Sequence, residues 1–288
     1  MKNTRVFAIC SLLAAASAVN AQVTIPTNLD HFNCYLAPGP IQPGSMLLQD
    51  QFDIAPPSAV FLPGLYESIT DLRPLLFCNP TQKTTANGAT NKILHPDAHL
   101  LMYFISPQAS IPRRVAIENQ FGTAVLETGR AVILAVPTGK AVVSANSTVP
   151  PLPPIPPAQE LDHFKCYEAG GESINSVVTL TDQFRAAPTQ VLKPFLFCNP
   201  TAKTVLNGTT GAAVTTPVEH PLSHLTCYLT TPVAFQGGVT YNNQFVIPGT
   251  LLPTLTLSQS ELLCVPSAKV RWLVIPPPTV SSGPPAGS

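Results

Sequence analysis

Four of the six histidines recur at one position of a repeated pattern, and histidine is well suited to metal binding or proton transfer near neutral pH. In three cases a cysteine follows three residues later, a spacing that metal sites also use. However, residues three apart in a strand point to opposite faces, and a cysteine held in a disulfide cannot bind a metal. We therefore expect structural histidines that hydrogen-bond a neighbouring loop, with metal binding and catalysis as the alternatives. The four are His31, His99, His163 and His224.

A second recurrent motif, Asp or Asn followed by Gln and Phe, could offer oxygen ligands to calcium. Calcium requires about six to eight oxygens, whereas each repeat supplies one Asp or Asn. Alternation between Asp and Asn is typical of a side chain that caps its own backbone turn, and the phenylalanine then anchors the turn in the core. The motif occurs at Asp50-Gln51, Asn119-Gln120, Asp182-Gln183 and Asn243-Gln244.

A lysine also recurs once per repeat, after a turn that contains proline. We expect it to shield a sheet edge, and the alternative is a ligand contact. The four lysines are Lys83, Lys140, Lys203 and Lys269.

Motifs of nucleophilic catalysis are missing from the sequence. There is no Gly-x-Ser-x-Gly, no His-Glu-x-x-His and no glycine-rich phosphate loop. Ser223 and His224 are adjacent, so on a strand their side chains point to opposite faces and cannot pair. The 15 acidic residues do not single out a carboxylate pair of the glycosidase type. The sequence therefore nominates no catalytic, cofactor-binding or metal-binding residue, and we expect no cofactor.

These recurrent residues belong to a fourfold repeat. The segment 29–35 returns at 161–167, and Phe77-Cys78-Asn79-Pro80 returns as Phe197-Cys198-Asn199-Pro200. The offset changes from 132 to 120 residues between these motifs, which indicates a 12-residue insertion near 58–73. Each copy also repeats within itself, so the chain carries four versions of one unit.

Six cysteines follow the first 21 residues, and the second unit has Met102 and Ala135 where the other three units have cysteine. Joint loss of both cysteines indicates a bond within each unit, because a lone thiol would otherwise remain; pairing across units is the alternative. We predict Cys34–Cys78, Cys166–Cys198 and Cys227–Cys264, and an oxidising compartment.

Alternating and β-branched segments, such as 161–167 and 177–181, predict short strands. With three or four strands per unit, the sequence predicts an all-β protein of two tandem β-sandwich or small β-barrel domains, each internally duplicated about a pseudo-two-fold axis. We expect domain one at 22–145 and domain two at 159–275. Between them, 146–158 is expected to be a proline-rich semi-rigid spacer, and 276–288 a disordered tail.

The N-terminus has the plan of a secretory signal peptide at 1–21. Lys2 and Arg5 precede an apolar run at 6–18 and small residues that end at Ala21, so the mature chain should begin near Gln22; cleavage after Ala18 is the alternative. Lys plus Arg equals Asp plus Glu at 15 each, which provides no basic field for nucleic acid. No later apolar run reaches the length of a membrane span.

The Leu-Asp-His-Phe-x-Cys-Tyr, Asp-Gln-Phe and Leu-x-Cys-x-Pro-x-x-Lys signature resembles an uncharacterised family in secreted bacterial proteins, domain of unknown function 7450. The resemblance covers two tandem copies, essentially 29–140 and 161–269. It implies export and a β-rich fold, and it supplies no activity, substrate or catalytic residue. The cysteine-free second unit departs from the signature.

We therefore expect an exported, non-catalytic, disulfide-stabilised module with a binding or structural role at the cell surface or extracellular matrix. Its location would be secreted or periplasmic/extracellular, and its partner a surface or matrix ligand bound with avidity by two domains. The apolar loop 60–66 with Tyr66 is a candidate contact, and the alternative is a loop folded back on its own domain. The alternative is a secreted hydrolase that acts on polysaccharide or peptide.

Overall fold

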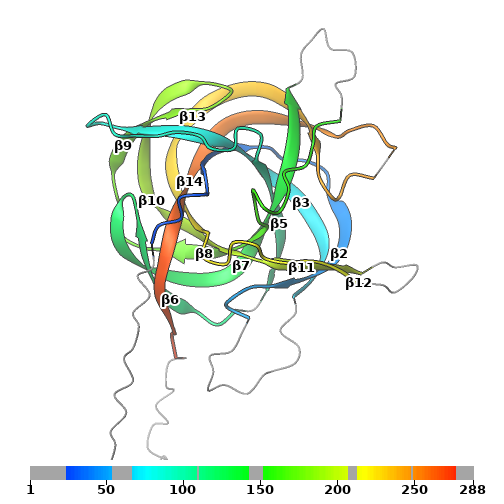
Figure 1. Ribbon diagram of the computed structural model, residues 1–288, viewed down its shortest axis with the longest axis horizontal. Helices are drawn as coiled ribbons and strands as arrows, with labels where there is room; N and C mark the ends of the chain where they lie inside the picture. Colours follow the sequence, from blue (N-terminus) through cyan, green and yellow to red (C-terminus); the bar gives the residue numbers. More distant parts are fainter. Residues whose placement is uncertain are drawn as a thin grey trace, which may run out of the picture.

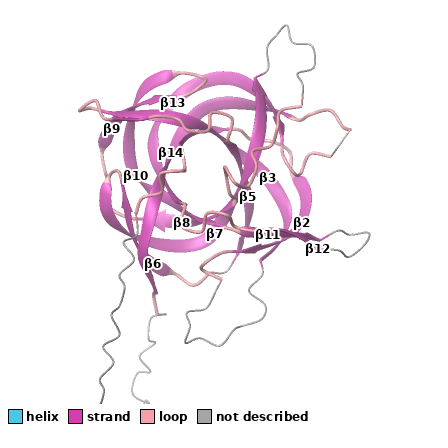
Figure 2. Ribbon diagram, viewed as in Figure 1, coloured by secondary structure: helices cyan, strands magenta, loops and turns pink. Residues whose placement is uncertain are grey.

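The computed structural model describes residues 24–53, 67–108, 110–142, 152–206, 213–247 and 249–276. The expected signal peptide, the candidate contact loop 60–66 and the expected tail after residue 276 lie outside these ranges. Within them the chain forms strands and loops, as Figure 2 shows, and the all-β prediction is confirmed. The described residues include no helix of the length and apolarity needed to cross a membrane.

The strands differ greatly in length, and the neighbouring strands in the sheet are antiparallel. They are β1 (His31–Leu36), β2 (Gln42–Gln49), β3 (Glu67–Thr85), β4 (Thr90–Asn91), β5 (His99–Gln108), β6 (Arg113–Asn119), β7 (Gly122–Val142), β8 (Phe164–Gly170), β9 (Ser176–Thr181), β10 (Ala186–Pro200), β11 (Ala202–Leu206), β12 (Ala213–Thr216), β13 (His224–Asn242) and β14 (Thr254–Val274).

Eight strands of the described chain close into a barrel in the order β1-β14-β13-β10-β8-β7-β5-β3, and β3 pairs again with β1 (Figure 1). Each repeat contributes two neighbouring antiparallel strands. We call these pairs unit 1 (β1 and β3), unit 2 (β5 and β7), unit 3 (β8 and β10) and unit 4 (β13 and β14). Around the ring, unit 1 therefore lies opposite unit 3 and unit 2 opposite unit 4.

This arrangement differs from the expected pair of separate domains. The two halves of the chain meet along two seams, where β1 pairs with β14 and β7 pairs with β8. Each half supplies four strands, and neither half closes a ring without the other half. The proline-rich segment therefore does not hold two domains apart, and the avidity expected from two separate domains has no basis in this fold.

The described part of the proline-rich segment packs against the barrel. The carbonyl oxygen of Pro153 accepts a hydrogen bond of 3.0 Å from Nδ2 of Asn242 in β13. A Cβ atom at Gly139 in β7 would lie 2.2 Å from the carbonyl oxygen of Pro154, so only glycine allows this crossing.

Strand alternation fills the barrel with apolar side chains. Phe32 and Cys34 face inward, whereas Asn33 and Tyr35 on the same strand face outward. The inward side chains of all four units form a single buried cluster. The barrel interior is therefore a packed core to which every repeat contributes equally.

The three disulfides lie in this core and join the predicted pairs, Cys34–Cys78, Cys166–Cys198 and Cys227–Cys264. Each bond connects residues directly opposite one another on the two strands of a unit. Met102 and Ala135 are opposite one another in the same way and are fully buried in the same cluster. The Met–Ala pair thus fills the volume of the absent disulfide, as predicted.

Four hairpins form a second layer outside the barrel (Figure 1). Each begins as a continuation of one unit and crosses the outer face of the next unit around the ring. The β9–β10 hairpin of unit 3, for example, buries Val178 and Leu180 against Tyr228 and Leu263 of unit 4. The hairpins carry the Asx-Gln-Phe motifs at their tips, and residues 58–66 of the expected insertion lie outside the described residues.

Each tip docks on the unit opposite its own, through contacts between residues 109 to 147 positions apart in the chain. The hairpin of unit 3 places Asp182 against Tyr35 of unit 1, and the hairpin of unit 1 returns the contact by placing Asp50 against Tyr167 of unit 3. Units 2 and 4 exchange tips in the same way through Asn119 and Asn243. The outer layer therefore interlocks all four repeats.

Proline marks irregular points within the long strands. Strand β10 runs continuously from Ala186 to Pro200 although Pro194 lies within it. Its register against β13 shifts on both sides of Pro194. A bulge therefore accommodates the missing backbone N–H group, as is usual for proline inside a sheet.

Candidate functional site

The four Asx side chains cap their own turns, as the alternation of Asp and Asn predicted. In each motif Oδ1 accepts a hydrogen bond from the backbone N–H of the phenylalanine two residues later, at 2.7–3.0 Å. The other polar atom of the side chain, Oδ2 of Asp or Nδ2 of Asn, binds a tyrosine of the opposite unit. Oδ2 of Asp182 accepts from the hydroxyl of Tyr35 at 2.8 Å and from Nδ2 of Asn33 at 2.9 Å.

The tyrosines that receive the tips were not singled out in the sequence, although each follows the first cysteine position of its unit. All four are at most 1% exposed. Burial and the neighbouring Asp182 raise the pKa of Tyr35, so its hydroxyl remains a donor. The described tyrosines at these positions are Tyr35, Tyr103, Tyr167 and Tyr228.

The histidines are buried at the beginning of the first barrel strand of each unit or just before it. Burial lowers the pKa of His31 to about 4 and that of His163 to about 3, and the pKa values of His99 and His224 lie well below 6.5 for the same reason. The recurrent lysine of the same unit further lowers each value. The histidines are therefore neutral at physiological pH.

Each glutamine of a tip lies at the histidine site of the preceding unit. Gln244 and His163 are joined through their Nε2 atoms at 2.9 Å. Gln183 donates to the carbonyl oxygen of Pro96, three residues before His99, and Gln51 donates to the corresponding carbonyl of Pro221. Gln120 faces the ring of His31 as Gln244 faces that of His163, and this contact offsets part of the effect of burial on the pKa of His31.

The lysines lie between the two layers, and the expectation that they shield a sheet edge is wrong. Lys83 is 1% and Lys203 is 2% exposed, and burial lowers the pKa of all four to about 8. Each ammonium group lies over the phenylalanine of the next unit's tip, as Lys83 does over Phe121 at 5.1 Å from the ring centre. The other three pairs are Lys140–Phe184, Lys203–Phe245 and Lys269–Phe52.

Two lysines also have an amide partner from the preceding unit. Nζ of Lys140 donates to Oδ1 of Asn79 at 2.8 Å, and Nζ of Lys269 donates to Oδ1 of Asn199 at 3.2 Å. The residues that correspond to these asparagines in units 2 and 4 are Val136 and Val265. Consequently Lys83 and Lys203 are held by burial and ring contacts rather than by such an amide.

A charged pair locks the tip of unit 1. Lys165, whose side chain is fully buried, lies 3.0 Å from the carboxylate of Asp53. The corresponding positions in the reverse contact carry Asn33 and Arg185, so both residues change together between the two halves. Asn33 binds Asp182, and Arg185 binds Ser260. This joint change in the sequence is a signal for contact between units 1 and 3.

No group of three or more His, Cys, Asp or Glu side chains within the described ranges could hold a metal ion. The four recurrent histidines belong to different units and do not converge on one point. Their neighbours are instead the glutamine, proline and lysine groups described above.

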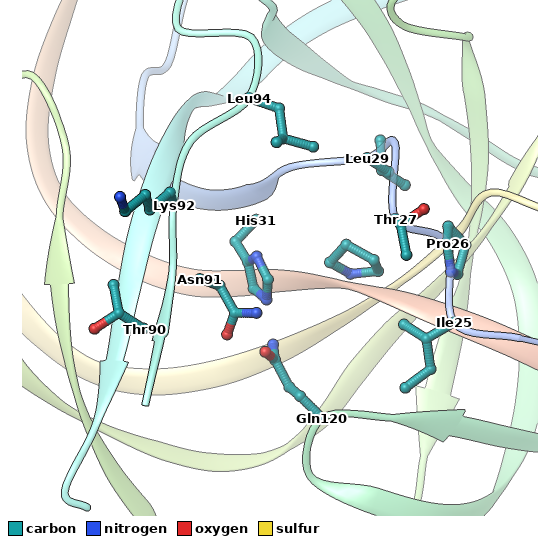
Figure 3. Close-up of a pocket in the computed structure, with 11 residues that line it drawn as sticks. Ile25, Pro26, Thr27, Leu29, His31, Thr90, Asn91, Lys92, Leu94 and Gln120 are labelled. Atoms are coloured by element: carbon teal, nitrogen blue, oxygen red, sulfur yellow. The ribbon is translucent and has the colours of Figure 1, made fainter. Parts of the chain in front are cut away.

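One pocket of about 390 Å³ does include a recurrent histidine (Figure 3). It lies at the histidine site of unit 1. Residues 25–29, which lead into β1, form one wall, and residues 90–94, which include β4, form the facing wall. His31 and Gln120 lie between these two walls. The lining consists of Ile25, Pro26, Thr27, Leu29, His31, Thr90, Asn91, Lys92, Leu94, Gln120 and Pro266.

The pocket combines an aliphatic wall with hydrogen-bonding groups. Ile25, Leu29 and Leu94 supply apolar surface, whereas Asn91 and Lys92 are exposed polar groups at its rim. Nε2 of His31 and both side-chain amide atoms of Gln120 are buried, so they are not exposed to the pocket.

Comparison with curated proteins and with solved structures finds no match to this chain. A family model described as a repeat of unknown function, DUF7450, matches residues 102–266, which is more than half of the 288 residues. The match begins in β5 and ends in β14, and thus includes strands of units 2, 3 and 4. The chain therefore belongs to the family of the repeat of unknown function DUF7450.

Proposed function

We propose that the protein is an exported, non-catalytic scaffold with a binding or structural role at the cell surface or extracellular matrix. The observation that carries this proposal is the exchange of tips between opposite units. Asp182 binds Tyr35, and Asp50 binds Tyr167, so the recurrent polar groups serve contacts between repeats. A side chain engaged in this way is not available to a substrate.

The disulfides support export. Three bonds connect strands inside the barrel core, and such bonds persist in oxidising compartments. Each closes a loop of 32 to 44 residues, which in the chain-entropy model stabilises the fold by roughly 3–4 kcal/mol. An interlocked and cross-linked barrel is suited to an environment without chaperones or reductants.

Two measurements test the proposal. The full chain, expressed with residues 1–21, should be recovered outside the cytoplasm with an N-terminus near Gln22 and all six remaining cysteines oxidised. Retention inside the cell with free thiols would contradict export.

The exported protein is then applied to an array of surface glycans and matrix proteins, and the same components are examined for cleavage products. A binding role predicts saturable retention without cleavage of the retained component. A purely structural role predicts no saturable retention and no cleavage. Cleavage of a polysaccharide or peptide that a heat-unfolded control lacks would overturn the non-catalytic assignment in favour of a hydrolase.

A further inference from the structure

Two of the four recurrent lysines lie against the side-chain amide of a buried asparagine. Nζ of Lys269 in β14 donates to Oδ1 of Asn199 in β10 at 3.2 Å, and Nζ of Lys140 in β7 donates to Oδ1 of Asn79 in β3 at 2.8 Å. A carbonyl carbon lies about 1.2 Å from its oxygen, so each Nζ lies no more than about 4.5 Å from the amide carbon Cγ. Each pair therefore places an amine beside a carbon that an amine can attack.

The surroundings of both lysines favour the uncharged amine, which is the form that can attack. Nζ of Lys269 lies 4.9 Å from the ring centre of Phe52, and Nζ of Lys140 lies 4.5 Å from that of Phe184. Burial lowers the pKa of both lysines to about 8. Roughly a tenth of each amine is then uncharged at pH 7, against less than about 0.1% at the ordinary pKa. A reaction that occurs once in the lifetime of a chain needs no larger fraction.

A carboxylate completes the set of groups at Asn199. Nδ2 of this asparagine donates to Oδ2 of Asp50 at 3.2 Å, and Asp50 is buried. The carboxylate thus contacts the nitrogen that would leave the amide, and it can pass a proton to that nitrogen. The corresponding aspartate at the other pair is Asp182, whose negative charge counteracts the effect of burial on the pKa of Lys140.

We propose that each lysine forms an isopeptide bond with its asparagine, Lys269 with Asn199 and Lys140 with Asn79. The lone pair of the uncharged Nζ attacks Cγ, a Cγ–Nζ amide bond forms, and the Cγ–Nδ2 bond breaks. One proton passes from Nζ to Nδ2, which leaves as ammonia, and Asp50 carries this proton at the first pair. An amine and an amide become an amide and ammonia, so the step needs no oxidant, reductant or second reactant.

Lys140 has a second amide neighbour, because its Nζ also donates to Oε1 of Gln183. The side chain of Gln183 is exposed, whereas Asn79 is fully buried. A buried amide is held in one position and is shielded from water, and both conditions favour attack by a neighbouring amine. The bond is therefore assigned to Asn79.

The other two recurrent lysines provide controls within the same chain. Lys83 and Lys203 are also buried over a phenylalanine, and burial lowers their pKa to about 8. The residues at the corresponding asparagine positions of the preceding units are Val265 and Val136, which have no carbonyl group in the side chain. These two lysines share the environment of the reactive pair but lack the amide.

The two bonds join neighbouring units, whereas each disulfide stays within one unit. The Asn79–Lys140 bond connects units 1 and 2, and the Asn199–Lys269 bond connects units 3 and 4. Thiols do not break amide bonds, so these links hold each half of the ring together where the disulfides are reduced. The inference goes beyond the proposed binding or structural role and does not depend on it.

Mass spectrometry of the full mature protein tests the proposal. After reduction of the disulfides, the protein should be lighter than its sequence by the mass of two molecules of ammonia. Cyclisation of an N-terminal glutamine loses the same mass, so tryptic peptides must locate each bond. Trypsin should fail to cleave after Lys140 and Lys269, and fragment ions should place branches at Asn79 and Asn199.

Three variants separate the chemistry from the fold. Lys269→Met should remove one branch and restore the mass of one molecule of ammonia, whereas the matched control Lys203→Met should leave both branches in place. Asp50→Asn should keep its turn, since Asn119 and Asn243 cap the equivalent turns. This variant should nevertheless lose most of the bond to Lys269 in freshly purified protein, because an amide does not carry the proton.

Branches at both asparagines, lost one at a time in Lys269→Met and Lys140→Met, would support the proposal. The full sequence mass after reduction, with complete cleavage after both lysines, would overturn it. A branch at Gln183 in place of Asn79 would overturn the assignment of the second bond, and an undiminished first bond in Asp50→Asn would overturn the role of that carboxylate. The proposed matrix role is tested separately by the array.

Discussion

The hydroxyl of Tyr35 donates a hydrogen bond of 2.8 Å to the carboxylate of Asp182, a residue 147 positions later in the chain. The tyrosine belongs to the barrel wall of unit 1 and the aspartate to the hairpin tip of unit 3. Tyr167 and Asp50 form the same contact with the roles of the two units reversed. Opposite quarters of the protein therefore hold each other in place through side chains that recur in every repeat.

Removal of the Tyr35 hydroxyl should cost more stability than the same change in unit 4. Tyr35→Phe takes a hydrogen bond from a carboxylate, whereas Tyr228→Phe takes one from the neutral amide of Asn119. Hydrogen bonds to charged groups contribute about 1.5–3 kcal/mol, and neutral ones about 0.5–1.5 kcal/mol. Urea unfolding of both variants measures the difference, and equal losses would argue against a stronger hydrogen bond at the Tyr35–Asp182 contact.

Asp53 should be essential for stability because its carboxylate lies 3.0 Å from Nζ of the fully buried Lys165. Asp53→Asn removes that carboxylate and should lower the free energy of unfolding by about 3 kcal/mol. The double change Asp53→Asn with Lys165→Asn also removes the buried charge that the single change leaves unpaired, and should recover part of the loss. A double variant no more stable than Asp53→Asn would show that the loss does not come from the charge of Lys165.

A fourth disulfide should form in unit 2. Met102 and Ala135 are directly opposite and occupy the positions that cysteines hold in the other units. Met102→Cys with Ala135→Cys should therefore oxidise spontaneously and stabilise the protein by about 2–4 kcal/mol, mainly through the unfolded state. Thiol titration and thermal unfolding with and without reductant measure this, and Met102→Cys alone is the control. Free thiols in the folded double variant would contradict the register of β5 and β7.

Acid should destabilise the protein before its carboxylates titrate. The folded-state pKa of His163 is about 3, against an ordinary value of 6.5, because the ring is buried. The unfolded chain therefore binds more protons between these values, and stability present above pH 6.5 is lost as the pH falls. His163→Gln should reduce the slope of unfolding free energy between pH 5 and 6 by up to about 1.4 kcal/mol per pH unit. An unchanged slope would mean that His163 is protonated in the folded protein.

The local features of this fold follow from residues close together in the sequence. The disulfide pairs follow from the joint loss of cysteine at Met102 and Ala135, and the Asx caps from the alternation of Asp50 and Asn119. Both depend on contacts within one unit, and repetition of the unit makes each pattern visible four times.

The order of the units around the ring could not be predicted in the same way. One edge of β1 pairs with β3 of its own unit, and the partner of its other edge, β14, is more than 200 residues away in the chain. Because the four units have similar sequences, the sequence does not distinguish β14 from β7 as this partner. The prediction that the recurrent lysines shield a sheet edge was wrong because the hairpins that cover them come from another unit, as at Lys83. One repeat by itself does not reveal this cover. Only one feature of the sequence carried information about these distant contacts. Asn33 corresponds to Lys165 and Arg185 to Asp53, so both positions change together between the two halves.

The most direct test of the account cleaves the chain between its two halves. A protease site is introduced within residues 143–151, and the folded protein is cut under non-reducing conditions. All three disulfides lie within one half or the other, so no covalent bond joins the fragments after cleavage.

A single ring with interlocked tips predicts that both fragments elute together in size-exclusion chromatography and unfold in one transition. Fragments that separate without denaturant, each retaining its own folded structure, would contradict the shared barrel and restore the two independent domains expected from the tandem repeat.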